Sequence, residues 1–169
     1  YQYIQTISQS PASSLPTPMF NLINGGQHAH NNLDFQEYMI IPFSMRTFHE
    51  KLAAGKKIFA VLGQILQEAG HDTQIGDEGG YAPNLSTNEE GFGLLVKAIQ
   101  TAGFIPGTDV VLGSDIAASA LPPTFAATVD NFFSLFNNFP LFSLEDPFAE
   151  DDIPHWTELK EKIDAMSDP

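Results

Sequence analysis

Hydrophobic and polar positions follow two different periods along the chain. The run "PMFNLIN" at 18–24 is short, apolar and closed by Gly25 and Gly26, and "LDFQEYMII" at 33–41 alternates until Pro42. Short apolar or alternating runs bounded by glycine or proline are typical of β-strands. The pattern therefore predicts two strands, which we expect to be neighbours in a sheet.

A helical period, with apolar residues three or four positions apart, marks longer segments. We expect Ser44 to cap the first of them and Gly70 to stop it, whereas Ser86 and Glu89 have the spacing of a capping box for the second. Four segments carry this pattern: 44–69, 86–103, 131–139 and the stretch that begins near Pro154.

Two further strands are predicted between these helices, over 110–118 and 140–147. Because strands and helices alternate here, we predict parallel pairing and an α/β architecture. Asp115 and Glu145 each follow an apolar run, which places acidic side chains at the carboxyl ends of strands, where α/β barrels carry their active sites. The pattern contains about four strands, half of the eight in a closed barrel. The predicted fold class is therefore α/β, an incomplete TIM-type barrel.

The predicted division of the chain is simple. Residues 1–14 are polar, show little periodicity and form a poorly defined leading segment, and residues 15–169 form the partial barrel domain. The chain begins with Tyr1 and ends directly after a helical pattern. We therefore expect it to be part of a longer protein.

Composition narrows the classes of partner. The 169 residues carry 21 acidic and 7 basic side chains, for a formal net charge of −14, and 43% of them are hydrophobic. Such an acidic chain is a poor partner for nucleic acid or for an anionic membrane. No apolar stretch approaches the ~18 residues of a membrane span. The absence of cysteine excludes a thiolate metal site and fits a reducing compartment, so we expect a cytoplasmic protein.

The two strand-end acids suggest a metal site. Asp115 and Glu145 have no Lys or Arg beside them in sequence, so two carboxylates from neighbouring strands would repel each other unless a cation lay between them. Oxygen ligands of this kind suit Mg²⁺. The alternative is that each acid merely caps the next helix or ends its strand in solvent.

Three other stretches hold candidate chemistry. Glu78 lies in "QIGDEGGYAPN" at 74–84, where the glycines after it allow close approach of the backbone and positive φ, a setting in which a carboxyl group can act as an acid. His28 and His30 form an H-x-H pair that could hold zinc in a hydrolase, although an exposed polar turn explains it as well. Gln36 and Glu37 are adjacent on a predicted strand, so both reach one site only at a bulge or at the strand end.

Several long motifs, in order, resemble a known family. They are "LPTPMFNLINGGQHAHNNLDFQEYMIIP", "GDEGGYAPNLSTNEE", "DIAAS" and "SLEDPFAEDD". Together they resemble enolase, the Mg²⁺-dependent lyase that dehydrates 2-phosphoglycerate to phosphoenolpyruvate in glycolysis, over about Leu15 to Trp156. The resemblance covers the first half of the family's C-terminal barrel. It implies that Glu78 protonates the departing 3-hydroxyl, and that Asp115 and Glu145 are two of three carboxylates that hold Mg²⁺.

The resemblance also implies that His28, Gln36 and Glu37 line the pocket for the substrate, 2-phosphoglycerate, and that the full-length protein is a homodimer. The family's third metal carboxylate and its base lysine would lie beyond Pro169, so we expect the fragment alone to be inactive. An alternative is a shortened, non-catalytic relative that binds Mg²⁺ or a protein partner. An isolated half-barrel should also expose two strand edges and apolar surface.

Overall fold

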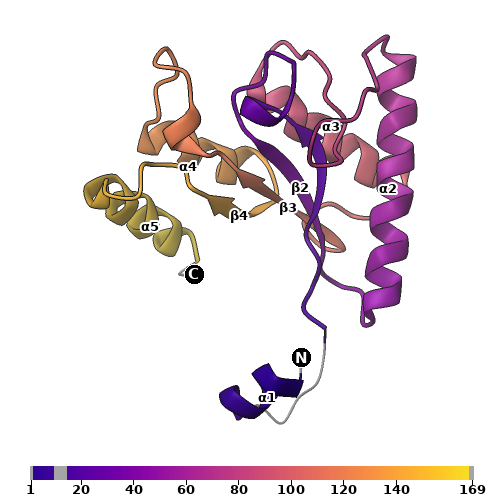
Figure 1. The fold of residues 1–169 in the computed structure, drawn as a ribbon, viewed down its shortest axis with the longest axis horizontal. Helices are drawn as coiled ribbons and strands as arrows, with labels where there is room; N and C mark the ends of the chain where they lie inside the picture. Colours follow the sequence, from indigo (N-terminus) through magenta and orange to yellow (C-terminus); the bar gives the residue numbers. More distant parts are fainter. Residues whose placement is uncertain (1, 10–14, 168–169) are drawn as a thin grey trace.

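The computed structural model describes residues 2–9 and 15–167 (Figure 1). Its centre is a four-stranded sheet with the spatial order β1-β2-β3-β4. The strands are β1 (Phe20–Asn24), β2 (Glu37–Pro42), β3 (Val110–Asp115) and β4 (Leu141–Glu145). With the helices around it, this open sheet makes a mixed α/β fold that is part of a TIM-type barrel, as predicted.

The sheet contains both antiparallel and parallel pairs. β1 and β2 are neighbours, as predicted, and they are antiparallel. β2 and β3 are also antiparallel, and only β3 and β4 are parallel. Two helices, not one, connect β2 to β3, so the chain returns to the end of the sheet from which it left and enters β3 in the opposite direction. The parallel pairing predicted from the alternation of strands and helices is thus confirmed for β3 and β4.

The helices lie close to their predicted positions, with caps shifted by one to three residues. They are α2 (Phe48–Glu68), α3 (Asn88–Thr101), α4 (Val129–Asn138) and α5 (Ile153–Ser167). Thr47, not Ser44, caps α2 in a capping box with Glu50, and Thr87, not Ser86, accepts the Glu90 backbone N–H at the start of α3. Gly70 has φ +79°, which is consistent with its predicted role as the stop of α2.

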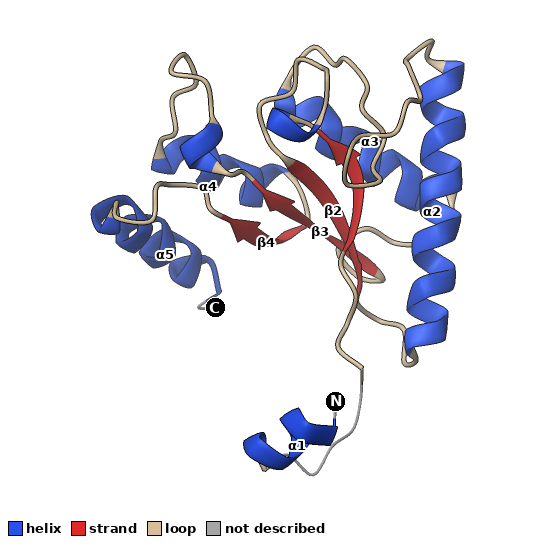
Figure 2. Cartoon of the chain, viewed as in Figure 1, coloured by secondary structure: helices blue, strands red, loops and turns tan. Residues whose placement is uncertain are grey.

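The hydrophobic core lies between the sheet and its helices. α2 and α3 pack against each other and against β2, α3 also contacts β3, and α4 packs against β4 and α5 (Figure 2). Tyr38, Ile40 and Leu112 from the strands are fully buried with Leu62 of α2 and Phe92 of α3. The rings of Tyr38 and Phe92 lie 4.9 Å apart between their centroids. This layer holds the strands in place.

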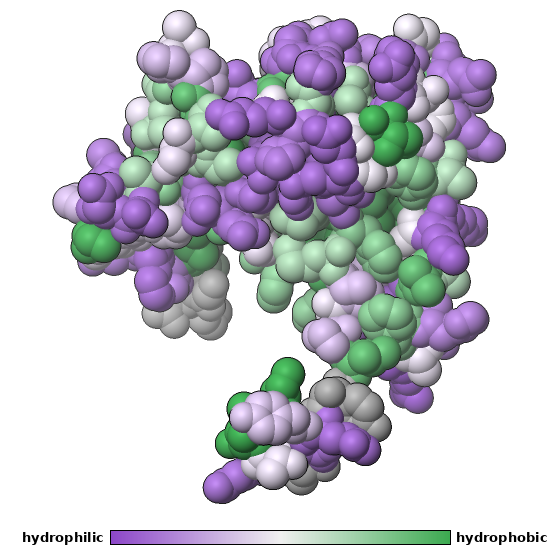
Figure 3. Space-filling model, viewed as in Figure 1, coloured by the Kyte–Doolittle hydropathy of each residue, from purple (hydrophilic) through white to green (hydrophobic). Residues whose placement is uncertain are grey.

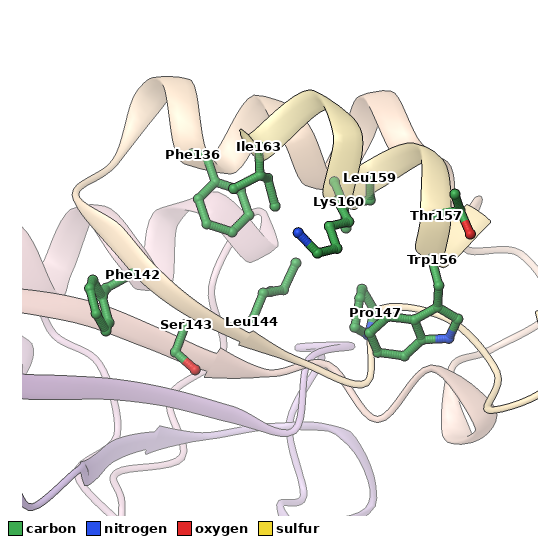
Figure 4. A pocket seen from close by; sticks show the side chains of 10 residues that line it. All are labelled: Phe136, Phe142, Ser143, Leu144, Pro147, Trp156, Thr157, Leu159, Lys160 and Ile163. Carbon is green, nitrogen blue, oxygen red and sulfur yellow. The ribbon is translucent and has the colours of Figure 1, made fainter. Parts of the chain in front are cut away.

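The outer strand β4 is far less covered. Phe142 is 62% exposed, and its ring lies 5.7 Å from that of the exposed Phe43. A cavity of about 540 Å³ separates β4 from α5 (Figure 4), and its lining includes Phe142, Leu144, Trp156 and Ile163. The sheet thus ends in an uncovered apolar edge, as expected for a half-barrel.

The leading segment contains a short helix, α1 (Gln2–Ser8), with no buried residue. The predicted boundary at residues 14 and 15 falls partly outside the described residues, so the domain division stays a prediction. Among residues 2–9 and 15–167, no helix is both long and apolar enough to cross a membrane.

Candidate functional site

Four polar side chains form a row across one end of the sheet. In the pairing register, Asn24 of β1 is opposite Glu37 of β2, Glu37 is opposite Asp115 of β3, and Asp115 is opposite Glu145 of β4. Neighbouring strands lie about 4.8 Å apart, so paired residues are close together. Because β2 is antiparallel, its first residue lies at the end of the sheet where β1, β3 and β4 finish. Figure 3 shows hydrophilic residues gathered over the same end of the molecule.

Glu78 is brought to this row by a small hairpin that attaches to β1. The Tyr81 N–H donates to the Leu22 carbonyl and the Asn24 N–H donates to the Tyr81 carbonyl, each at 2.9 Å. Within the hairpin, the Gly76 N–H donates to the Gly80 carbonyl at 2.7 Å. Glu78 therefore lies at the tip of a tight, hydrogen-bonded turn, not on a loose acidic loop.

The two glycines after Glu78 serve different purposes. Gly79 has φ +87°, a conformation that side chains with a Cβ rarely adopt. At Gly80 a Cβ would lie 2.8 Å from the Asn24 Oδ1 and 2.9 Å from the Leu22 carbonyl carbon. One glycine therefore permits the turn and the other permits its close approach to β1, which are the two properties anticipated from the sequence.

Besides Glu37, which is described below, three side chains contact the Glu78 carboxylate. Asn24 donates its Nδ2 to Oε2 at 3.0 Å, Asn21 donates to the same oxygen at 3.3 Å, and the His28 Nδ1 lies 3.4 Å from Oε1. The Glu78 side chain is 28% exposed, so it is neither free in solvent nor sealed off. Such contacts orient the carboxylate and leave part of it open to a ligand.

Glu37 has the largest electrostatic perturbation at the row. Burial, a hydrogen bond with Glu78 and the charges of Glu78, Asp115 and Glu145 raise the pKa of Glu37 to about 7. A protonated Glu37 can donate this hydrogen bond, because two carboxyl groups in contact cannot both ionise cheaply. Glu37 therefore keeps its proton up to a higher pH than an ordinary glutamate does.

Asp115 and Gln36 are joined directly. The Gln36 Nε2 donates to the Asp115 Oδ2 at 3.3 Å, and the Ala117 N–H donates to Oδ1 at 2.9 Å. Gln36 precedes β2 and Glu37 begins it, so the strand end brings both side chains to one site. Burial, together with the charges of Asp146 and Glu78, raises the pKa of Asp115 despite the hydrogen bond from Ala117.

Glu145 completes the row. Burial and the charges of Asp115 and Asp146 raise the pKa of Glu145. The backbone beyond both strands is unusual: Ala117 has φ +51° and Asp146 has φ +44°. The Ala118 N–H donates to the Asp146 carbonyl at 2.9 Å and ties these two segments together. Non-glycine residues with positive φ concentrate at functional sites.

The donor set was tested against a hard divalent cation. Asp115 and Glu145 supply oxygen ligands from neighbouring strands. The charge of Asp115 raises the pKa of Glu145, and the charges of Asp146 and Glu78 raise that of Asp115, so a cation would relieve the repulsion among these acids. In this respect the chemistry fits Mg²⁺. As placed, however, the described part of the chain contains no group of three His, Asp or Glu side chains that could hold a metal ion. The pair is thus a partial ligand set.

The H-x-H pair does not form a zinc site. The His28 Nδ1 lies 3.4 Å from Glu78, and His30 is exposed. Both histidines border a polar cavity of about 130 Å³. Asp72 and Asp77 also line this cavity, but no three of the described side chains there are arranged to bind a metal. The exposed polar turn was the better interpretation.

The sequence matches the family described as "Enolase, C-terminal TIM barrel domain" over residues 12–167. The chain belongs to the enolase family. The match covers all four strands and the five residues of the polar end, Glu37, Glu78, Asp115, Glu145 and Asn24. An enolase-family barrel domain indicates a lyase that acts on a small molecule.

Sequence reasoning missed two residues of the site, Asn21 and Asn24. Both lie in the apolar run "FNLIN", where an asparagine at either position is out of character for a buried strand. Asn24 is fully buried, one of two polar residues so enclosed in the described part of the chain. A polar residue inside an apolar strand was the available signal.

Proposed function

We propose that this chain supplies half of the active site of an enolase that dehydrates 2-phosphoglycerate to phosphoenolpyruvate. The observation that carries the proposal is the convergence of Glu37, Glu78, Asp115 and Glu145 at one end of the sheet, on four separate segments. Acids gathered in this way match the positions that the family resemblance assigns to proton transfer and to metal binding. The remaining half would come from residues outside this chain.

Asp115 and Glu145 would hold Mg²⁺, with further ligands from outside the chain. Bound there, the ion would stabilise the negative charge that develops on the substrate carboxylate when the α-proton is removed. The weak acidity of that proton is the main obstacle to the reaction, so concentrated positive charge is needed at this place. Gln36 donates to one Asp115 oxygen and would fix the orientation of that ligand.

Glu78 would be the acid, with Glu37 as its proton partner. As the bond from the substrate to its 3-hydroxyl breaks, Glu78 would pass a proton to the departing oxygen, which leaves as water, and Glu37 would replace the proton on Glu78. The raised pKa of Glu37, about 7, keeps a proton available on Glu37 near neutral pH. His28, next to Glu78, would face the substrate from the same side.

The base that takes the α-proton is not provided by the row itself. The charges that shift the pKa values of Glu37, Asp115 and Glu145 come from carboxylates and from His28, and none comes from a lysine. The six lysines lie in helical segments, and Lys56 shares a cavity with Glu78 only at the outer edge of β1. We therefore propose that the full-length protein supplies the base. We also propose that the full-length protein is a homodimer, as is typical of the family, and that it acts in the cytoplasm.

The same observation favours one alternative, a non-catalytic relative that binds Mg²⁺ or a protein partner without turnover. A dehydration assay separates the two functions: phosphoenolpyruvate formation from 2-phosphoglycerate is followed for this chain and for the full-length protein, with Mg²⁺ and with a chelator. The proposal expects Mg²⁺-dependent turnover in the full-length protein and none in the chain alone. If the full-length protein showed no turnover, the catalytic proposal would fail and the non-catalytic function would be favoured.

A further inference from the structure

Asn24 makes an unusual set of contacts for a residue on a buried strand. Its Nδ2 donates to the Glu78 Oε2 at 3.0 Å, and its Oδ1 accepts the Gly80 N–H at 2.8 Å. Its backbone N–H donates to the Tyr81 carbonyl at 2.9 Å. One residue of β1 therefore holds both the carboxylate of Glu78 and the backbone of the turn that presents it.

A bulge in β1 makes this possible for two asparagines at once. Asn21 and Asn24 are three positions apart, so in a regular strand their side chains would point to opposite faces. The β1–β2 register shifts between Asn21 and Ile23, which inserts an extra residue and reverses the alternation. As a result, both amides donate to the same oxygen of Glu78.

The amide of Asn21 donates to Glu78 although its own oxygen is left without a hydrogen bond in the described part of the chain. The Asn21 Oδ1 is buried and has no hydrogen-bond partner among the described residues, while its Nδ2 points at Glu78. Turning the amide over would direct its oxygen at a carboxylate, which is worse. Two amide donors, one from the buried Asn24 and one from the half-buried Asn21, thus converge on one carboxylate oxygen.

Two glycines of the turn allow it to pack closely against Asn24. A Cβ at Gly76 would lie 2.8 Å from the Asn24 Cβ, and a Cβ at Gly80 would lie 2.8 Å from its Oδ1. The side chain is therefore enclosed by the turn on both sides and is fully buried. A shift of Asn24 would move the turn with it.

We infer that Asn24, assisted by Asn21, is a positioning residue that fixes the Glu78 carboxylate for proton transfer to the leaving group. Asn24 does not touch the substrate in this account; it acts through Glu78. The catalytic consequence rests on the proposed function, whereas the positioning itself can be tested without turnover.

The test uses Asn24→Asp and Asn24→Ala in this chain. The aspartate has the same shape and keeps an acceptor for the Gly80 N–H, but it replaces the donor to Glu78 with a carboxylate. The alanine removes both functions. Asn31→Ala is the matched control, because the Asn31 amide donates to the Asn24 carbonyl at 2.8 Å and has no hydrogen bond to Glu78 among the described residues.

Two NMR measurements separate the functions. The first is the Glu78 carboxyl ¹³C shift, together with the NOE between its Hγ protons and the Hβ protons of residue 24. The second is the hydrogen-exchange protection of the Gly80 amide. We expect Asn24→Asp to lose the Glu78 signature and keep the Gly80 protection, Asn24→Ala to lose both, and Asn31→Ala to keep both. Should Asn24→Ala fail to fold, Asn24→Asp decides. An unchanged Glu78 signature in Asn24→Asp overturns the inference.

Kinetics of the full-length protein add a second reading. Both Asn24 variants should lower kcat by about tenfold or more and change KM by less than about threefold, because a misplaced acid weakens the transition state more than the bound substrate. Equal loss in Asn31→Ala would overturn the inference. If the wild-type protein shows no turnover, the proposed function fails, and the NMR result alone decides the positioning.

Discussion

Burial has opposite effects on stability at the helix-covered face of the sheet and at its polar end. Under α2 and α3, Leu112 and Tyr38 are fully buried among other apolar side chains, and burial there favours the folded state. At the polar end, burial raises the pKa of Glu37, Asp115 and Glu145, so the folded state holds their ionised forms at a cost. The helix-covered face therefore stabilises the fold, and the cluster of acids at the polar end destabilises it.

This difference teaches which region to examine for function. The largest cavity described above, about 540 Å³, lies between β4 and α5 and is mainly apolar, away from the acids. Size alone would have selected the wrong place. Carboxylates that oppose one another, on a well-packed support, are the stronger indication of a site.

The largest expected effect belongs to the covered face. Leu112→Ala should lower the free energy of unfolding by about 2–5 kcal/mol, because it opens a cavity in the packed layer. Phe142→Ala, at a position that is 62% exposed, is the control and should change it by less than about 0.5 kcal/mol. Urea unfolding of both variants gives the comparison. Similar losses for the two would mean that the sheet is not supported mainly from its helix side.

Glu78→Gln tests the polar end in the opposite way. In the full-length protein this change should reduce turnover about 10²-fold or more, because the amide cannot supply the acid's proton. The melting temperature should stay close to that of the wild type, since Glu78 is partly exposed and contributes little packing. Near-normal turnover would remove Glu78 from the role of the acid.

A third prediction concerns the cation. Mg²⁺ at ten times its Kd should stabilise this chain by about 1.4 kcal/mol, because a ligand that binds only the folded state shifts the equilibrium. Asp115→Asn should abolish that gain, whereas the exposed Glu150→Gln should preserve it. Thermal unfolding with and without Mg²⁺ measures the difference. Equal loss in both variants would indicate general charge screening.

The smallest effect is a pH dependence of stability that comes from Glu37. Its folded-state pKa of about 7 lies above the ordinary value of 4.5, so between these values the folded state binds more protons than the unfolded state. Stability from this group is full below pH 4.5 and is lost as the pH rises through 7. After allowance for solvent screening we expect a loss of about 1 kcal/mol between pH 5 and 8.

Glu37→Gln should remove this slope, because glutamine does not titrate. Urea unfolding at several pH values in the presence of a chelator measures the wild type and the variant under the same conditions. If the stability of the wild type rose between pH 5 and 7, or if both proteins changed by the same amount, the assignment to Glu37 would be contradicted.

Local chemistry made much of this structure predictable. Apolar runs predicted the four strands, and the acids that follow two of these runs predicted that Asp115 and Glu145 lie at strand ends, because both signals are properties of neighbouring residues. The direction of β3 could not be obtained in this way, since it depends on how α2 and α3 return the chain. Residues 33–36 alternate like a strand, yet they form a loop. The Gly25 N–H donates to the Gln36 carbonyl and the Gly26 N–H donates to the Leu33 carbonyl, and these bonds hold the loop in place.

The contacts of Glu78 were equally out of reach of the sequence. Its loop was recognised, but its support depends on a bulge in β1 and on the side chains of Asn21 and Asn24, more than fifty residues earlier. A bulge leaves no clear pattern of its own in a short apolar strand. Long-range pairing, not local propensity, determines where this carboxylate points.

Paramagnetic relaxation by Mn²⁺ tests most directly whether Asp115 and Glu145, on neighbouring strands, share one hard cation. Mn²⁺ takes the same oxygen ligands as Mg²⁺ and broadens nearby NMR signals. On adding substoichiometric Mn²⁺ to this chain, the amide signals of Glu37, Asp115 and Glu145 should broaden first. The signal of Val110, roughly 16 Å away at the other end of β3, should persist. Broadening centred on the acidic loop 150–152, or spread evenly over the exposed acids, would contradict the account.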